Sequence, residues 1–231
     1  ERTAVLAVML VNNEIGVIQP VEALAGLAHE HGALFLCDAV QGYGRVDLPL
    51  SADMIAISGH KIYGPKGVGA LWLQNGLDMP PLIHGGGQEG GLRSGTLSPA
   101  LCVGLGEAAR LMTQRRIDDS SHVEALWNRA RALFDGWVLN GSASERYHGN
   151  LNLRREGLDA ARLMSDCREV AFSLGSACAS GSGRPSHVLR ALGLTDKQAR
   201  SSIRLGFGRY TTLDEIERAA HWINVAADTQ G

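Results

Sequence analysis

The sequence predicts an α/β fold: a mostly parallel sheet with helices on both faces, followed by a small α+β C-terminal domain. Near-continuous apolar runs at residues 4–11, 33–37 and 54–57 have the length and composition of strands that are covered on both faces. Residues 20–31, between the first two runs, carry apolar side chains at helical spacing. A strand, a helix and a second strand in this order are typical of a layered fold with parallel strands.

The remaining elements follow from the same patterns, and the patterns change after a polar stretch at residues 114–120. We place a domain boundary in this stretch and expect one domain at residues 1–116 and a second at residues 117–231. The first domain is predicted to add a strand at 68–73, a glycine-rich loop at 85–95 and a helix at 100–112. The second is predicted to hold strands at 150–153, 170–174 and 202–207, and helices at 121–134, 160–167, 185–191 and 213–227.

Composition narrows the class of protein. The chain has 231 residues, of which 45% are hydrophobic and 20% are charged, and its formal net charge is −2. This balance argues against direct nucleic-acid binding, and the sequence has no run of about 18 apolar residues that would span a membrane. The chain begins with Glu1 and soon enters an apolar run, without an initiator Met or a signal sequence. We therefore expect it to be part of a longer polypeptide or a cleavage product.

The four cysteines are too scattered for a zinc site. Cys37, Cys102, Cys167 and Cys178 form no CxxC pair, so we expect no metal centre and a reducing compartment, by default the cytoplasm. Cys37 lies in a predicted strand, and Cys102 and Cys167 lie in predicted helices, which favours core positions. Cys178 lies among Gly, Ser and Ala residues in what we expect to be a mobile, exposed loop. That setting favours a thiol that collects a group in one place and delivers it in another.

Lys61 is the first candidate for covalent chemistry. It follows the predicted strand at residues 54–57 in the stretch SGHKIYGPKG, and ligands gather at the carboxyl ends of strands in open α/β sheets. A lysine held there partly out of water can form a Schiff base with a carbonyl cofactor, while Ser58 and His60 can bond a phosphate. The alternative is a surface turn with a solvated lysine.

Two further strands are predicted to end in polar residues. Asp38 and Gln41 follow the strand at residues 33–37. A carboxylate there can keep the ring nitrogen of pyridoxal 5'-phosphate (PLP) protonated, and a glutamine can bond the ring oxygen. Asn12 and Asn13 end a third run, and one of their amides can bond a cofactor oxygen. The alternatives are a turn-capping role for Asp38 and plain turn formation by the asparagines.

Arg204 and Thr96 complete the candidates. Alternation in the predicted strand at residues 202–207 puts three apolar side chains on one face and Arg204 on the other, where a guanidinium can bind a carboxylate. An ordinary surface arginine fits the same pattern equally well. Thr96 follows the glycine-rich loop and offers a hydroxyl that can contact phosphate.

Together, these segments resemble the cysteine desulfurases of the class V aminotransferase group, within the fold-type I PLP enzymes. The cysteine loop is similar to that of the subgroup serving iron–sulfur cluster assembly and tRNA thiolation. The resemblance implies that residues 1–116 are the C-terminal half of the PLP-binding large domain and that residues 117–231 are the small domain with the catalytic cysteine. The matching stretches occur in the family's order and span nearly the whole chain: VNNEIGVIQP, DAVQ, SGHKIYGPKG, GGGQEGGLRSGT, SLGSACASG and SIRLGFGRYT.

The resemblance also implies a role for each candidate. The catalytic residues would be Lys61, which forms the Schiff base, Cys178, which takes the sulfur, and His60. Arg204 and Asn13 would bind the substrate, L-cysteine. The residues that hold pyridoxal 5'-phosphate would be Asn13, Asp38, Gln41, Ser58, His60 and Lys61, with Thr96 contacting the phosphate in the partner subunit of a homodimer.

The implied reaction moves sulfur from L-cysteine to Cys178 as a persulfide and releases L-alanine. The sulfur then passes to acceptor proteins, either an iron–sulfur scaffold or tRNA thiolation factors. Family members carry a further N-terminal segment with additional cofactor contacts. Either a separate N-terminal chain supplies that segment or this polypeptide alone binds PLP poorly, and we expect full activity to need it. Two alternatives stay open: a selenocysteine lyase or other β-eliminating PLP enzyme, and a non-catalytic fragment that acts as a scaffold.

Overall fold

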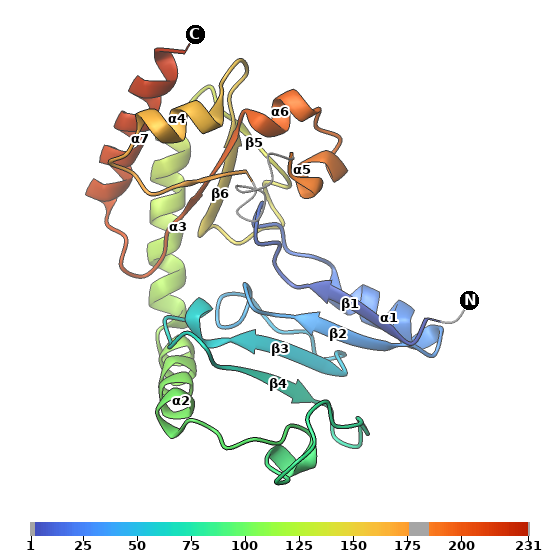
Figure 1. The fold of residues 1–231 in the computed structure, drawn as a ribbon. Coiled ribbons are helices and arrows are strands. Elements are labelled where there is room, and N and C mark those ends of the chain that lie inside the picture. The colour runs from blue at the N-terminus through green and yellow to red at the C-terminus, as the bar shows by residue number, and fades with distance from the viewer. Residues whose placement is uncertain (1–2, 176–184, 231) are drawn as a thin grey trace. The chain divides into compact units, whose positions relative to one another are not determined.

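The computed structural model describes residues 3–175 and 185–230, in which the chain divides into two compact units (Figure 1). The short segment Val11–Ile18 belongs to the second unit, although it lies in the sequence between two elements of the first. The first unit comprises Glu1–Leu10 and Gln19–Arg116, and the second comprises Val11–Ile18 and Ile117–Gly231.

The first unit is built on a four-stranded sheet with the strand order β1-β2-β3-β4, and helix α1 (Val21–Glu30) packs on β1 and β2 (Figure 1). The turn after β3 is closed by a hydrogen bond from Gly59 N to Val68 O of 2.9 Å, and this tight return makes β4 antiparallel to β3. The mostly parallel sheet of an α/β fold is thus confirmed. Its parallel strands are β1 (Val5–Met9), β2 (Leu34–Asp38) and β3 (Met54–Ser58), and β4 is Gly69–Leu73.

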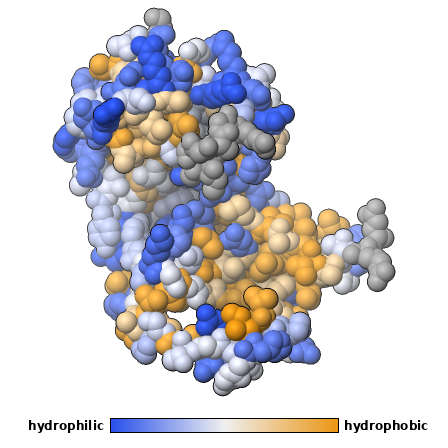
Figure 2. All heavy atoms as spheres, in the orientation of Figure 1, coloured by the Kyte–Doolittle hydropathy of each residue, from blue (hydrophilic) through white to orange (hydrophobic). Residues whose placement is uncertain are grey.

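The prediction that residues 4–11 form a strand covered on both faces is wrong for the described chain. The strand is present as β1, but β2 is its only neighbour in the sheet and Val5 is 45% exposed. On β4, Leu71 and Trp72 are also exposed. Figure 2 shows apolar side chains gathered at the surface over the sheet of this unit. Apolar composition therefore predicts these strands correctly, but it does not predict the exposure of β1 and β4.

Two helices follow the sheet with a single residue between them. α2 (Pro99–Gln114) covers the turn after β3, where Ala108 and Met112 pack against Ile62. α3 (Arg116–Leu133) begins earlier than the predicted residue 121, and the acidic side chains in its first turn favour that start because they face the positive end of the helix dipole. Between β4 and α2 the glycine-rich loop contains only one short helical turn, η2 (Glu89–Gly91).

The second unit is an antiparallel sheet, in the order β5-β6-β8-β7, packed against helices. Its core joins apolar side chains of α3, α4, α7, β6 and β8, among them Leu126, Leu163, Ile223, Leu151 and Ile203. The strands are β5 (Val138–Leu139), β6 (Asn150–Arg154), β7 (Ser173–Leu174) and β8 (Ser202–Gly206). The helices after α3 are α4 (Ala160–Asp166), α5 (His187–Ala191), α6 (Asp196–Arg200) and α7 (Leu213–Asp228).

The cysteines of the described chain divide by exposure. Cys37 and Cys167 are buried, as predicted, and burial raises the pKa of the Cys37 thiol to about 11, with a further rise from the negative charges of Asp38 and Glu22. The prediction of a core position for Cys102 is wrong: it is exposed on α2. Helical spacing placed it in a helix, but the covered face of α2 carries other residues.

Candidate active site

The carboxyl ends of β2 and β3 lie at the same edge of the sheet in the first unit. Asp38 is the last residue of β2 and Ser58 the last of β3, and the register of these parallel strands pairs Asp38 with Ala56. This edge is where open α/β sheets bind ligands. The cofactor candidates predicted from the ends of these two strands, Asp38, Gln41, Ser58, His60 and Lys61, lie at or directly after this edge.

The turn after β3 carries a hydroxyl, an imidazole and an amine in succession. Ser58 Oγ and His60 Nδ1 are 2.8 Å apart and form a hydrogen bond. His60 and Lys61 lie in the short helix η1 (Gly59–Lys61), whose Gly59 is needed because a Cβ there would stand 2.8 Å from Pro65 O. Lys61 is partly buried, and its amine has no hydrogen-bond or ion-pair partner among the described residues. An unpaired, partly buried amine is available to react with an aldehyde.

Asp38 makes the turn-capping contact that was weighed for it. Its Oδ1 accepts a hydrogen bond of 3.0 Å from Val40 N, which is the turn-capping contact. Its other carboxylate oxygen has no partner in the part of the chain that the structure describes. Capping the turn therefore leaves one oxygen of Asp38 for a further donor, such as a protonated ring nitrogen.

Arg45 is a site residue that the sequence did not reveal. Its Nη2 donates to Lys61 O at 2.5 Å and its Nη1 to Gln41 O at 3.4 Å, so one guanidinium holds the backbone of both candidates. Arg45 also lies over the ring of Tyr63, 5.9 Å from its centre. No local sequence signal marks this role, because both acceptors are backbone carbonyls that only the fold brings together.

The chemistry of this set fits PLP. The group needs an amine for its aldehyde, an acid for its ring nitrogen and hydrogen-bond donors for its phosphate. The first unit supplies the unpaired amine of Lys61, the half-engaged carboxylate of Asp38 and the bonded pair of Ser58 and His60 at one edge of its sheet.

The two substrate candidates lie together in the second unit. Arg204 is partly buried on β8, and its Nη1 donates to Asn13 O at 2.9 Å; the same oxygen accepts from Asn150 Nδ2 at 2.9 Å. The other guanidinium nitrogens of Arg204 have no hydrogen-bond partner among the described residues. Asn12 makes the turn itself, because its Oδ1 accepts from Glu14 N at 2.9 Å. That division leaves the side-chain amide of Asn13 free of turn contacts.

Two candidate residues, Thr96 and Cys178, have no described contact with the cofactor candidates at the sheet edge or with the substrate candidates of the second unit. Thr96 is exposed in the segment after the glycine-rich loop, and no described contact links it to the sheet edge. Cys178 lies outside the described residues. Cys37 is unsuited to replace it as a nucleophile, because its raised pKa keeps the thiol protonated at neutral pH.

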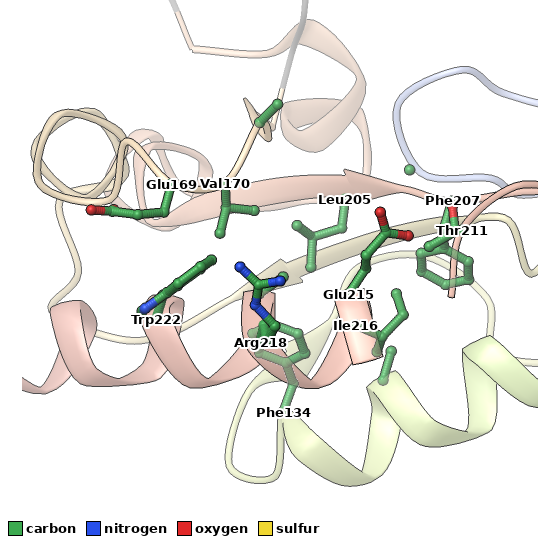
Figure 3. A pocket seen from close by; sticks show the side chains of 14 residues that line it. Phe134, Glu169, Val170, Leu205, Phe207, Thr211, Glu215, Ile216, Arg218 and Trp222 are labelled. Atoms are coloured by element: carbon green, nitrogen blue, oxygen red, sulfur yellow. The ribbon is translucent and has the colours of Figure 1, made fainter. Parts of the chain in front are cut away.

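A cavity of about 400 Å³ in the second unit is lined by none of the candidate residues (Figure 3). Arg218 and Trp222 rise into it from α7, with the guanidinium carbon 5.0 Å from the centre of the Trp222 ring. Its apolar wall includes Phe134, Leu205, Phe207 and Ile216.

The described residues contain no group of three or more His, Cys, Asp or Glu side chains arranged to hold a metal ion. Within the same residues, no helix has the length and apolar content to cross a membrane.

The sequence profile described as "Aminotransferase class-V" matches residues 1–219. The chain belongs to the class V aminotransferase family. Members of this family, including its cysteine desulfurases, are PLP-dependent enzymes, which confirms the cofactor expected from the sequence.

Named relatives of the chain confirm the resemblance to cysteine desulfurases. The chain is 45% identical over 223 residues to "Cysteine desulfurase, mitochondrial" of Eremothecium gossypii, covering 93% of this chain and 46% of that protein. It is 42% identical over 232 residues to "Cysteine desulfurase IscS" of Rickettsia rickettsii, covering 96% of this chain and 57% of that protein. The chain thus spans about half the length of the curated relatives it matches.

A solved structure titled "NIFS-LIKE PROTEIN" superimposes on this chain with a TM-score of 0.88 at 28% identity, covering 98% of this chain and 62% of that one. The likeness extends over both compact units and confirms the fold class.

Proposed function

We propose that this member of the class V aminotransferase family is a cysteine desulfurase that moves sulfur from L-cysteine onto Cys178 and releases L-alanine. The observation that carries the proposal is the sheet edge of the first unit. There Lys61, whose amine has no partner among the described residues, directly follows the hydrogen-bonded pair of Ser58 and His60, and the neighbouring strand β2 ends in Asp38. Relatives that are named cysteine desulfurases support the same activity.

Five residues of the first unit would hold PLP. Lys61 would take the aldehyde, Asp38 the ring nitrogen and Gln41 the ring hydroxyl, while Ser58 and His60 would bond the phosphate. Thr96 would reach the phosphate bound in the partner subunit of a homodimer. When bound, PLP supplies an electron sink for a carbanion at the substrate's α-carbon.

Side chains of the protein bind the substrate, move its proton and accept its sulfur. Arg204 and Asn13 bind the carboxylate of L-cysteine, and Lys61 Nζ takes the α-proton. The Cys178 thiolate attacks the substrate sulfur: the S–S bond forms as the C–S bond breaks, and the electron pair of the broken bond stays with the carbon. Protonation of that carbon and return of the α-proton from Lys61 Nζ give L-alanine, and Cys178 is left as a persulfide.

The persulfide is then passed to an acceptor protein, of the iron–sulfur scaffold or tRNA thiolation type. Residues 1–116 act as half of the cofactor domain and residues 117–231 as the small domain that carries Cys178. The free thiols of Cys37, Cys102 and Cys167 support a reducing compartment such as the cytoplasm, although one relative is named as mitochondrial.

The test compares Lys61→Ala and Cys178→Ser with the parent protein, all supplied with PLP. We expect Lys61→Ala to lose the visible absorbance of bound PLP and at least about a hundredfold in alanine formation from L-cysteine. We expect Cys178→Ser to keep that absorbance and lose sulfide release. The matched controls, Lys197→Ala and Cys102→Ser, change exposed side chains and should leave both readouts unchanged.

Sustained sulfide release by Cys178→Ser would contradict the role of that thiol. Parallel assays with L-selenocysteine and L-cysteine sulfinate separate a desulfurase from a selenocysteine lyase or another β-eliminating enzyme. A parent protein that stays colourless with added PLP would favour a non-catalytic scaffold.

A further inference from the structure

The turn that carries Asn13 is held through its backbone by side chains of the second unit. Three successive carbonyl oxygens of the turn each accept a hydrogen bond from a different side chain, so its backbone cannot shift without breaking several of them. These bonds run to Asn13 O from Asn150 Nδ2 (2.9 Å), to Glu14 O from Asn152 Nδ2 (2.9 Å) and to Ile15 O from Arg146 Nη2 (2.6 Å).

One of these side chains also holds the residue that precedes the segment 176–184, which contains Cys178. Asn152 is fully buried, and its Nδ2 lies 3.3 Å from Gly175 O as well as 2.9 Å from Glu14 O. Its Oδ1 accepts from Asn140 Nδ2 at 2.8 Å, which fixes the orientation of the amide. The side-chain amide of Asn152 thus joins the turn to Gly175, the last described residue before the Cys178 segment.

A described residue that follows that segment in the sequence also contacts the turn. Ser186 lies two residues after position 184, is 5% exposed, and donates its hydroxyl hydrogen bond to Glu14 Oε2. The same hydroxyl accepts from Leu189 N at 3.1 Å and so caps α5. Glu14 is 4% exposed, and Ser186 is the only side-chain donor to its carboxylate among the described residues.

A buried carboxylate is costly, and this one is not needed for the cap, because a serine hydroxyl caps a helix without an acid behind it. Its position has a different consequence. Glu14 follows Asn13 directly, so the residue that holds the far end of the Cys178 segment sits next to a candidate for binding the substrate carboxylate.

We propose that Glu14, Asn152 and Ser186 are positioning residues: they hold the described residues on either side of the Cys178 segment, Gly175 and Ser186, at the turn that carries Asn13. The inference rests on the proposed function. Transfer of sulfur requires the Cys178 thiol to meet the sulfur of bound L-cysteine, and a misplacement of about 1 Å at a reacting atom slows the reaction without weakening binding in proportion.

The test measures two steps in the PLP-loaded protein. Spectral titration gives the Kd for L-cysteine, and intact mass after a single turnover gives the rate of persulfide formation on Cys178. We expect Ser186→Gly to slow persulfide formation about tenfold or more while the Kd stays unchanged. Glycine serves nearly as well as serine at a helix N-cap, so Ser186→Gly keeps α5 capped. It also leaves the buried Glu14 carboxylate without its donor, whereas the double variant with Glu14→Ala removes both partners of the link.

Glu14→Gln keeps an oxygen acceptor for the Ser186 hydroxyl and should retain most of the parent rate, whereas Glu14→Ala should match Ser186→Gly. The double variant Glu14→Ala/Ser186→Gly should be no slower than the slower single variant, because both remove the same link. Hydrogen exchange should show that the backbone amide of Leu189 exchanges faster in Glu14→Ala than in the parent protein, both measured without L-cysteine. That amide bonds the Ser186 hydroxyl, which the hydrogen bond to Glu14 holds in place.

Thr195→Gly is the matched control, because it removes the N-cap of α6, another five-residue helix, without touching the turn. Equal slowing by Thr195→Gly, or parallel losses of affinity and rate in Ser186→Gly, would overturn the inference. So would a fully additive double variant. A parent protein that binds L-cysteine yet never forms a persulfide would instead overturn the proposed function, and the inference with it.

Discussion

At the scale of single residues, Arg45 decides how firmly the candidate cofactor site is held. Its guanidinium donates to Lys61 O at 2.5 Å and to Gln41 O at 3.4 Å. Two residues after Lys61, Tyr63 has a φ of 65°, in the left-handed region that side chains other than glycine rarely adopt. The contact of Arg45 with the Tyr63 ring, at 5.9 Å, lies beside this strained turn. Arg45 therefore supports the backbone on which the reactive amine stands.

We expect Arg45→Met to raise the Kd for PLP about tenfold, because a hydrogen bond from a charged group contributes about 1.5–3 kcal/mol. Absorbance titration with PLP measures the change. Arg110→Met is the matched control, since Arg110 bonds only to exposed Glu107 and Gln114 on α2. An unchanged Kd in Arg45→Met, or an equal rise in Arg110→Met, would show that the carbonyl contacts do not support the site.

The residues that the sequence brought forward are those whose own side chains would carry the proposed chemistry. Asp38, Ser58 and Lys61 could be selected because each follows an apolar strand, and parallel strands end at a common edge. Arg45 could not be selected, because it acts on backbone carbonyls of residues that meet it only after folding. The same reason hid Glu14 and Ser186, which lie far apart in the sequence and meet in a buried hydrogen bond.

At the scale of elements, the segment Val11–Ile18 depends on Arg146 for its place in the second unit. Arg146 is 5% exposed, and its Nη1 and Nη2 donate to four backbone carbonyls, including Ile15 O at 2.6 Å and Asn150 O at 3.1 Å. Its guanidinium carbon lies 4.8 Å from the centre of the Trp127 ring. Burial lowers the pKa of Arg146 to about 10, with a further decrease from the positive charge of Arg131. The carbonyl oxygens and the ring face compensate for that burial.

Arg146→Met should therefore lower the free energy of unfolding by about 3 kcal/mol, because it leaves buried carbonyls without a donor. Urea unfolding followed by tryptophan fluorescence measures this loss. Arg129→Met removes an exposed arginine paired with Glu217 and should cost less than about 1 kcal/mol. Similar losses in the two variants would mean that the buried guanidinium does not anchor the segment.

Elements were predictable where a pattern was long, and missed where only a few residues formed them. The helix predicted at residues 213–227 is α7 (Leu213–Asp228), whose start is marked in the sequence by the capping box of Thr212 and Glu215. β5 has only two residues and no alternating pattern to reveal it, and β7 keeps only two of the five residues expected at 170–174. α6 was missed although Thr195 and Gln198 form the same type of capping box.

At the scale of the whole molecule, the candidate residues fall into two sets that the fold keeps in separate units. The cofactor set, with Asp38 and Lys61, belongs to the first unit, and the carboxylate set, with Asn13 and Arg204, belongs to the second. The order of motifs predicted the family. It could not predict that Asn13 belongs to the second unit, because that depends on bonds to Asn150 and Arg204 far along the chain.

This division predicts that substrate affinity can be lost without loss of the cofactor. Arg204→Gln removes a charged donor for the substrate carboxylate but leaves the Asn13 turn in place, since Asn150 Nδ2 still bonds Asn13 O at 2.9 Å. We expect the Kd for L-cysteine to rise about hundredfold, or about 3 kcal/mol, while the absorbance of bound PLP stays unchanged.

Cysteamine, which has an amine and a thiol but no carboxylate, shows whether that loss arises at the carboxylate. The parent protein should bind L-cysteine much more tightly than cysteamine, whereas Arg204→Gln should bind both with the weak affinity of the parent for cysteamine. Arg162→Gln, which changes an exposed arginine paired with Asp166 on α4, should keep the full preference for L-cysteine. If Arg204→Gln weakened binding of cysteamine as much as of L-cysteine, Arg204 would act by holding the turn and not by receiving the substrate carboxylate.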